Sequence, residues 1–129
     1  MPGLRRLVGP LLGGIFITGG LDVLQRPESR VKLAAPVVEQ VAALVPHAPA
    51  DPDEAVRLNA LVHVLAGSAL ALGVMPRVAA LVLAGSLVPT TFGGHRFWEL
   101  EDPAARAQQR THFLKNAAIF GALLVEALA

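Results

Sequence analysis

Polar side chains that could bind a ligand are concentrated in one stretch of an otherwise apolar sequence. Residues 95–116 read HRFWELEDPAARAQQRTHFLKN and combine imidazole, guanidinium and amide groups. Such groups, close to a medium of low dielectric constant, form strong hydrogen bonds and could hold a polar head group, a quinone or a partner protein. The candidate binding residues in this stretch are His95, Arg96, Gln109, His112 and Asn116.

A further candidate, His63, lies within an apolar stretch, one helical turn after Asn59. If this stretch is a helix in a membrane, the histidine should face other helices, where it could relay protons, bind a quinone or ligate haem. Haem is the least favoured of these, because it would need a second buried histidine, and His47, His95 and His112 look peripheral. A single hydrogen bond to a neighbouring helix is favoured over all three.

No motif of a known catalytic or metal site is present. His95 and His112 are seventeen positions apart, no carboxylate lies in ligand register with them, and patterns such as HExxH are absent, so no metal site is predicted. The chain has no Cys, which excludes thiolate ligands and thiol nucleophiles. Phosphate-binding loops, nucleophile elbows and dinucleotide fingerprints are also absent. The sequence favours a protein without catalytic activity of its own, and its catalytic residues, if it has any, are unknown.

Four other residues of the polar stretch are explained by a helix that enters a membrane. Asp102 can cap the free N–H groups of a helix start, and Pro103 suits the first helical position. Trp98, the only tryptophan, is typical of the interface between membrane and water, and Lys115 can extend its ammonium group to that interface. One helix can then run from this cap to the C-terminus.

The rest of the sequence predicts the helices that must position these residues. The chain has 129 residues, of which 53% are hydrophobic and 16% charged, whereas a soluble domain carries about a quarter charged residues. Four apolar stretches approach the roughly 20 residues that a helix needs to cross a membrane. The sequence therefore predicts an all-α integral membrane four-helix bundle, a single domain over residues 1–129. Its spans are about 7–25, 55–75, 78–94 and 111–129.

The first long loop contains a short amphipathic helix, within VKLAAPVVEQVAALVPHA. Its apolar residues recur at helical spacing, but the segment is too short to cross a membrane, so it should lie on the bilayer or cap the bundle. Four spans place both termini on the same side of the cell (inner or plasma) membrane. The count of Lys and Arg favours long loops that face the cytoplasm. Lipid is the expected surrounding, and a net charge of +1 gives no indication of nucleic-acid binding.

Three pairs of small residues at four-residue spacing could let helices approach closely. We favour the interpretation that these pairs pack helices within one bundle over the interpretation that they form a dimer interface. A homo-oligomer is still one of the candidate assemblies. The pairs are Gly9 with Gly13, Gly67 with Ala71, and Ala117 with Gly121.

The chain resembles the DoxX family of small bacterial membrane proteins over essentially its whole length. The resemblance rests on RRLVGPLLGGIFITGGLDVL, on the hairpin LALGVMPRVAALVLAGSLVPTT and, most specifically, on HRFWELEDPAARAQQRTHFLKNAAIFGALL. The sequence departs from the family pattern at His63, because many relatives carry an acidic residue early in the second span. A family activity that depends on that acid would be in doubt here.

The resemblance implies a four-helix bundle that acts as an accessory or scaffold subunit of a membrane-associated oxidoreductase system for redox, thiol or sulfur metabolism. Quinone is the candidate ligand, and redox enzymes are the candidate partners. A quinone-linked oxidoreductase that acts by itself is the first alternative, with His63 or His112 as proton carriers. A small permease or channel is the second, and it would need an oligomer, because four short helices leave little room for a pore.

Overall fold

The computed structural model describes residues 2–129, and helices account for most of this range. It contains five α-helices and one short 3-10 helix. They are α1 (Pro2–Gln25), α2 (Glu28–Leu44), α3 (Pro52–Leu72), α4 (Pro76–Gly94), η1 (Phe97–Glu99) and α5 (Pro103–Leu128). No β-strand occurs among the described residues. The amphipathic segment of the first long loop is α2, and the helix that begins at the Asp102 cap is α5.

Local chemistry fixes several helix ends. Asp51 precedes α3 and accepts a hydrogen bond from the backbone N–H of Asp53 at 3.1 Å. Asp102 precedes α5 and accepts one from the N–H of Ala105 at 3.0 Å. A proline follows each aspartate, at a position where a missing N–H costs no helical hydrogen bond. Gly73 ends α3 with φ of 72°, a left-handed conformation that glycine adopts without steric cost.

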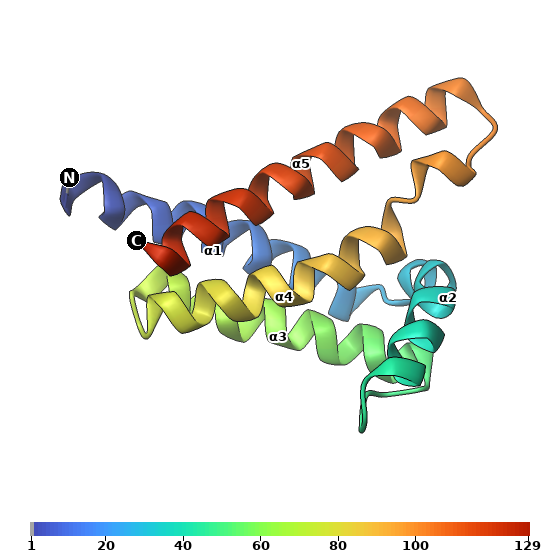
Figure 1. The fold of residues 1–129 in the computed structure, drawn as a ribbon, viewed down its shortest axis with the longest axis horizontal. Helices are drawn as coiled ribbons and strands as arrows, with labels where there is room; N and C mark the ends of the chain where they lie inside the picture. Colours follow the sequence, from blue (N-terminus) through green and yellow to red (C-terminus); the bar gives the residue numbers. More distant parts are fainter. Residues whose placement is uncertain (1) are drawn as a thin grey trace.

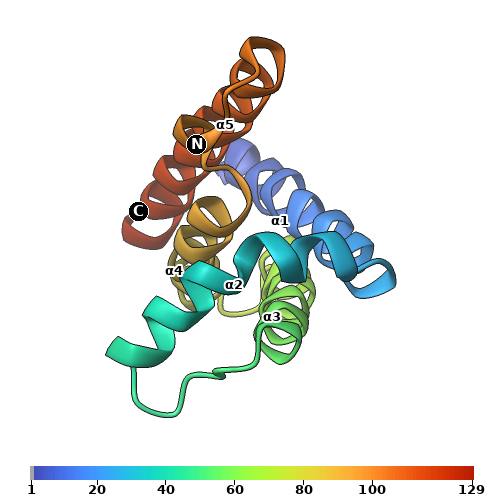
Figure 2. The ribbon, with the colours of Figure 1, turned by 90° about the vertical axis from the view of Figure 1, so that its right-hand side faces the viewer.

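The helices pack as a bundle that α2 covers at one end. Helix α1 packs on α3, and α5 packs on α4. In Figure 1 the hairpin of α3 and α4 forms one side of the bundle, and α1 and α5 lie above it. Helix α2 crosses the end of the hairpin and contacts both α3 and α4, as the turned view in Figure 2 also shows. The described chain begins and ends at the opposite end of the molecule. Helix α2 therefore caps the bundle, one of the two placements expected of it.

The apolar core lies in the half of the bundle that contains the chain ends. Leu70, Leu83 and Leu123 are its largest fully buried side chains, and they come from α3, α4 and α5. Small residues at the start of α4, such as Ala80, let these helices approach. The buried apolar residues concentrate in this half. The buried polar side chains, His63, Thr91 and Asn116, lie nearer the other half of the bundle, beneath α2.

Helices α1 and α3 meet through glycines. A Cβ at Gly13 would collide with the backbone carbonyl oxygen of Gly67, and a Cβ at Gly20 would lie 2.7 Å from the carbonyl oxygen of Ala60. Two of the predicted small-residue pairs thus form this contact. The third does not take part, because Ala117 and Gly121 are exposed and a Cβ at Gly121 would meet no atom within 4 Å.

Three helical segments are long and apolar enough to cross a membrane: Arg6–Gln25, Pro52–Leu72 and Pro76–Glu99. Large apolar side chains such as Leu11, Leu65 and Leu81 lie on their outer surfaces. A water-soluble surface rarely exposes so many, whereas lipid chains accommodate them. The segment 111–129, predicted as a fourth span, forms most of α5 and is not among these three.

Candidate functional site

A cavity of about 590 Å³ lies in the half of the bundle beneath α2. Its wall is formed by the second half of α1, by α2, by the first half of α3, by the end of α4 and by the first half of α5. The volume is within the 300–1,000 Å³ that is usual for small-molecule sites. Most of its wall is apolar, with side chains such as Phe16, Val37 and Leu87.

Five of the six candidate binding residues line this cavity. They belong to α3, to the connection after α4, and to α5, so the fold brings together residues that are far apart in the sequence. Arg96 is not part of the lining, whereas Lys115, which was assigned to membrane anchoring, is. The five candidates in the lining are His63, His95, Gln109, His112 and Asn116.

The imidazoles of His95 and His112 stack at one side of the cavity. Their ring centroids are 5.2 Å apart, and the ring planes differ by 22°. His95 Nδ1 lies 2.7 Å from Gln109 Oε1. Since an amide oxygen only accepts, Nδ1 carries the proton and donates it, which leaves Nε2 of the neutral ring as an acceptor. Gln109 therefore fixes both the orientation and the tautomer of His95.

Two adjacent threonines of α4 connect the cavity wall to its neighbours. Asn59 Nδ2 on α3 donates to Thr90 Oγ1 at 2.6 Å, and Asn116 Nδ2 on α5 donates to Thr91 Oγ1 at 3.1 Å. Each threonine hydroxyl donates in turn to the backbone carbonyl four residues earlier. These bonds hold the last turns of α4 between α3 and α5, where apolar contacts are fewer.

His63 is buried, with 7% of its surface exposed, and it packs against Phe16 of α1. The two rings meet edge to face with centroids 5.0 Å apart. The hydrogen bond to a neighbouring helix that the sequence favoured is not made by Nε2, which is buried without a partner among the described residues. An unpaired buried nitrogen costs about 1–3 kcal/mol. The part of the bundle that the structure describes provides no partner that would offset this cost at His63 Nε2.

The cavity is lined by cations and by no acidic side chain among the described residues. Arg30 of α2 and Lys115 of α5 contribute to its wall. Neither takes part in an ion pair within the part of the chain that the structure describes. Arg30 was missed as a site residue, but its spacing could have identified it, since it precedes Leu33 and Val37 by three and seven positions on the same helix.

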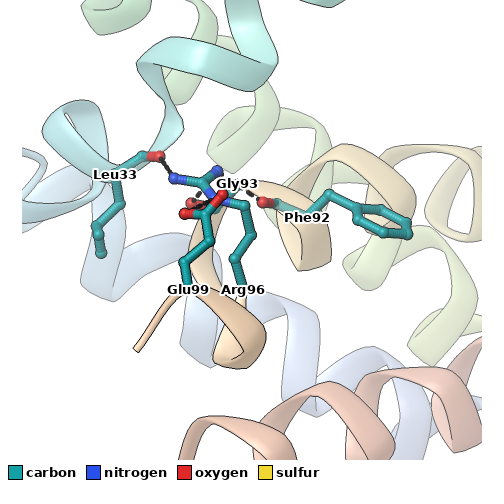
Figure 3. Close-up of polar contacts among 5 residues, drawn as sticks. All are labelled: Leu33, Phe92, Gly93, Arg96 and Glu99. Atoms are coloured by element: carbon teal, nitrogen blue, oxygen red, sulfur yellow. Dashed lines mark hydrogen bonds and ion pairs between the residues drawn. The ribbon is translucent and has the colours of Figure 1, made fainter. Parts of the chain in front are cut away.

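Arg96 joins α2 to the end of α4 instead of entering the cavity (Figure 3). Its guanidinium donates to the carbonyl oxygens of Leu33 at 2.9 Å and of Phe92 at 2.8 Å. It also forms an ion pair with Glu99 at 2.9 Å and a longer bond to the carbonyl oxygen of Gly93. The side chain is 16% exposed, so these bonds are partly shielded from water.

The aromatic residues near Arg96 form a separate cluster. Trp98 packs against Phe92, Phe97 and Phe113, with ring centroids 5.2–6.1 Å apart. Nearly half of the Trp98 surface stays exposed. Residues 112 and 113 thus face different surroundings on α5, since His112 lines the cavity and Phe113 supports the connection from α4.

Apolar helices that pack together and leave large apolar side chains on their outer surfaces are the architecture of a helical membrane protein. The sequence model of the DoxX family matches residues 6–96, more than two thirds of the chain, and the protein is a membrane protein of the DoxX family. The match includes α1 to α4 and ends at Arg96, so nearly all of the string HRFWELEDPAARAQQRTHFLKN lies beyond it. No curated protein and no solved structure matches the chain.

Proposed function

We propose that this protein is a quinone-binding accessory subunit of a membrane-bound oxidoreductase system. The observation that carries the proposal is the cavity beneath α2, where imidazole and amide groups project from apolar helices. The arrangement suits a flat ring with oxygen atoms at its edge and an apolar tail, because the apolar wall accepts the ring and tail while a few polar groups orient the oxygens.

His95 is the residue proposed to contact the quinone head group. Its Nε2 accepts when the ring is neutral, so it would accept a hydrogen bond from the hydroxyl of a quinol. His112 stacks on the same ring and also lines the cavity. His63 also lines the cavity, at the wall formed by α1 and α3, and its Nε2 is buried without a partner within the described chain. These groups bind and orient the ring and can hold protons.

Electron transfer is assigned to a partner protein. The sequence has no Cys and no motif for a flavin or a dinucleotide, so the proposal gives the chain the role of binding the quinone beside an enzyme that carries redox groups. The first turns of α5 are the proposed contact with that enzyme. Arg106, Gln108 and Arg110 are exposed there, next to the cavity.

The proposal places the chain in the cell membrane as a bundle of four spans. Residues 111–129 of α5 add a fourth span to the three apolar segments. An even number of spans puts both termini on one side of the membrane.

Binding of a short-chain quinone tests the site. We expect Gln109→Leu to weaken binding about three- to tenfold, because the imidazole of His95 loses the acceptor that fixes its tautomer and orientation. His95→Leu should weaken it further. Titration of purified protein, followed by the fluorescence of Trp98 and by calorimetry, gives the dissociation constants. Gln108→Leu is the matched control, since Gln108 is exposed and does not line the cavity. Equal effects at both glutamines would contradict the site.

Isolation of the protein from its native membranes tests the accessory role. Crosslinking followed by affinity purification should recover a redox enzyme, and variants at Arg106 and Arg110 should reduce its recovery. Repeated purification without any redox enzyme would overturn this part of the proposal. Turnover of quinol by the purified chain alone would favour the alternative, an oxidoreductase that acts by itself.

A further inference from the structure

We infer that the cavity binds the anionic form of a quinone-type ring more tightly than the neutral form. This inference rests on the proposed quinone site and adds the charge of the ligand to it. The evidence is the distribution of ionisable side chains around the cavity, together with the positions of its apolar and polar walls.

The charged residues of the lining are all basic. Arg30 and Lys115 line the cavity, and among the described residues no aspartate or glutamate does. The ion pairs found in this part of the chain join Arg57 with Asp53 and Arg96 with Glu99, so neither Arg30 nor Lys115 is neutralised by a carboxylate. A ligand in the cavity therefore experiences a positive potential that no acidic group of the wall offsets.

The two cations belong to different helices and lie beside the histidines. Arg30 is in the first turn of α2, and Lys115 is one turn beyond His112 on α5. His95, at the end of α4, lines the same cavity. An anionic oxygen has no proton to donate to Nε2 of His95, so it would bind beside Lys115 and Arg30, while the ring extends toward the apolar residues of α1 and α2.

The expected preference is moderate. Lys115 is exposed and Arg30 is half-buried, so water screens both charges at the entrance of the cavity. A ring inside the apolar wall is screened less, because the attraction between two charges grows as the local dielectric constant falls. We expect the anion to bind about tenfold more tightly than a neutral ring of the same size. For a quinone reduced by one electron from the partner enzyme, a tenfold preference raises the one-electron potential by about 59 mV.

Two naphthoquinones of nearly equal size test the inference. In 2-hydroxy-1,4-naphthoquinone the hydroxyl is ionised at neutral pH, whereas 2-methyl-1,4-naphthoquinone is neutral. Calorimetric titration of the full chain in a non-ionic detergent should give a dissociation constant about tenfold lower for the anion. Lys115→Gln and Arg30→Gln should each reduce this ratio about threefold, and Lys115→Arg should preserve it. Lys32→Gln, an exposed change on the same helix as Arg30 and outside the cavity lining, should leave the ratio unchanged.

The outcomes separate this inference from the proposed function. If neither naphthoquinone binds, the quinone site itself is wrong, and the charge preference is wrong with it. If both bind with the same affinity, the site stands and the charge preference is overturned. A preference that survives in Lys115→Gln and in Arg30→Gln also overturns the inference, because the anion would then be recognised by other residues.

Discussion

Replacing Gly13 with alanine should destabilise the protein by about 1–3 kcal/mol, the usual cost of adding a methyl group to a packed interface. The new Cβ would collide with the carbonyl oxygen of Gly67 and lie 3.0 Å from the backbone nitrogen of Ala71. Backbone atoms of a helix cannot turn aside as a flexible side chain can. Helix α1 would therefore have to move away from α3, along the contact that also includes Gly9 and Gly20.

Gly14→Ala is the matched control, one position along the same helix. A Cβ at Gly14 would meet no atom within 4 Å. Alanine favours a helix over glycine by about 0.5–1 kcal/mol, so this variant should be as stable as the parent or slightly more stable. Thermal unfolding of both variants in the same detergent, followed by circular dichroism, gives the comparison. Equal stability of the two variants would contradict the close approach of α1 and α3.

The same substitution should also affect the cavity. Phe16 lies one turn after Gly13, lines the cavity and packs against His63 of α3. A displaced α1 would separate these two rings and weaken quinone binding, although Gly13 itself does not line the cavity. The reciprocal change, Gly67→Ala, places a Cβ 2.9 Å from the carbonyl oxygen of Gly13 and should act in the same direction. Their effects should not add, because both changes widen one contact.

The helices could be predicted from the sequence because apolar length and helix caps are local properties. Residues 55–75 and 78–94 correspond to α3 and α4, and the cap at Asp102 marks the start of α5. The observed helices begin a few residues before the predicted spans, because a span is defined by apolar residues and a helix by its hydrogen bonds. The position of α2 could not be predicted in this way. It depends on contacts between residues that are far apart in the sequence, such as the hydrogen bond from Arg96 to Leu33.

The site could be predicted in part. On α5, Gln109, His112 and Asn116 follow each other at three- and four-residue steps, so their common face was visible in the sequence. The partners of these residues were not visible. Nothing local to Asn116 indicates that its amide donates to Thr91 of α4. Nor does the sequence give the direction of a side chain such as Arg96, which has the chemistry of a binding residue but lies outside the cavity.

Replacing Arg96 with alanine should loosen α2 and destabilise the protein by about 2–3 kcal/mol, a value expected for the loss of charge-assisted hydrogen bonds that are partly shielded from water. The variant loses the bonds to the carbonyl oxygens of Leu33 and Phe92. Arg96→Lys should recover only part of the loss, because a single ammonium group lacks the planar fork that reaches acceptors on two helices. Limited digestion with trypsin should cleave α2 faster in Arg96→Ala, at sites such as Arg30.

Glu99→Gln separates the helix contact from the ion pair. The carboxylate of Glu99 is exposed, and exposed pairs contribute about 0–1 kcal/mol, so this variant should resemble the parent in stability and in cleavage of α2. If Glu99→Gln is as damaging as Arg96→Ala, the ion pair and not the bond to α2 is responsible. Since α2 forms part of the cavity wall, Arg96→Ala should weaken quinone binding and also make α2 easier to cleave. Gln109→Leu should weaken binding while α2 stays protected, because Gln109 acts on His95 and not on α2.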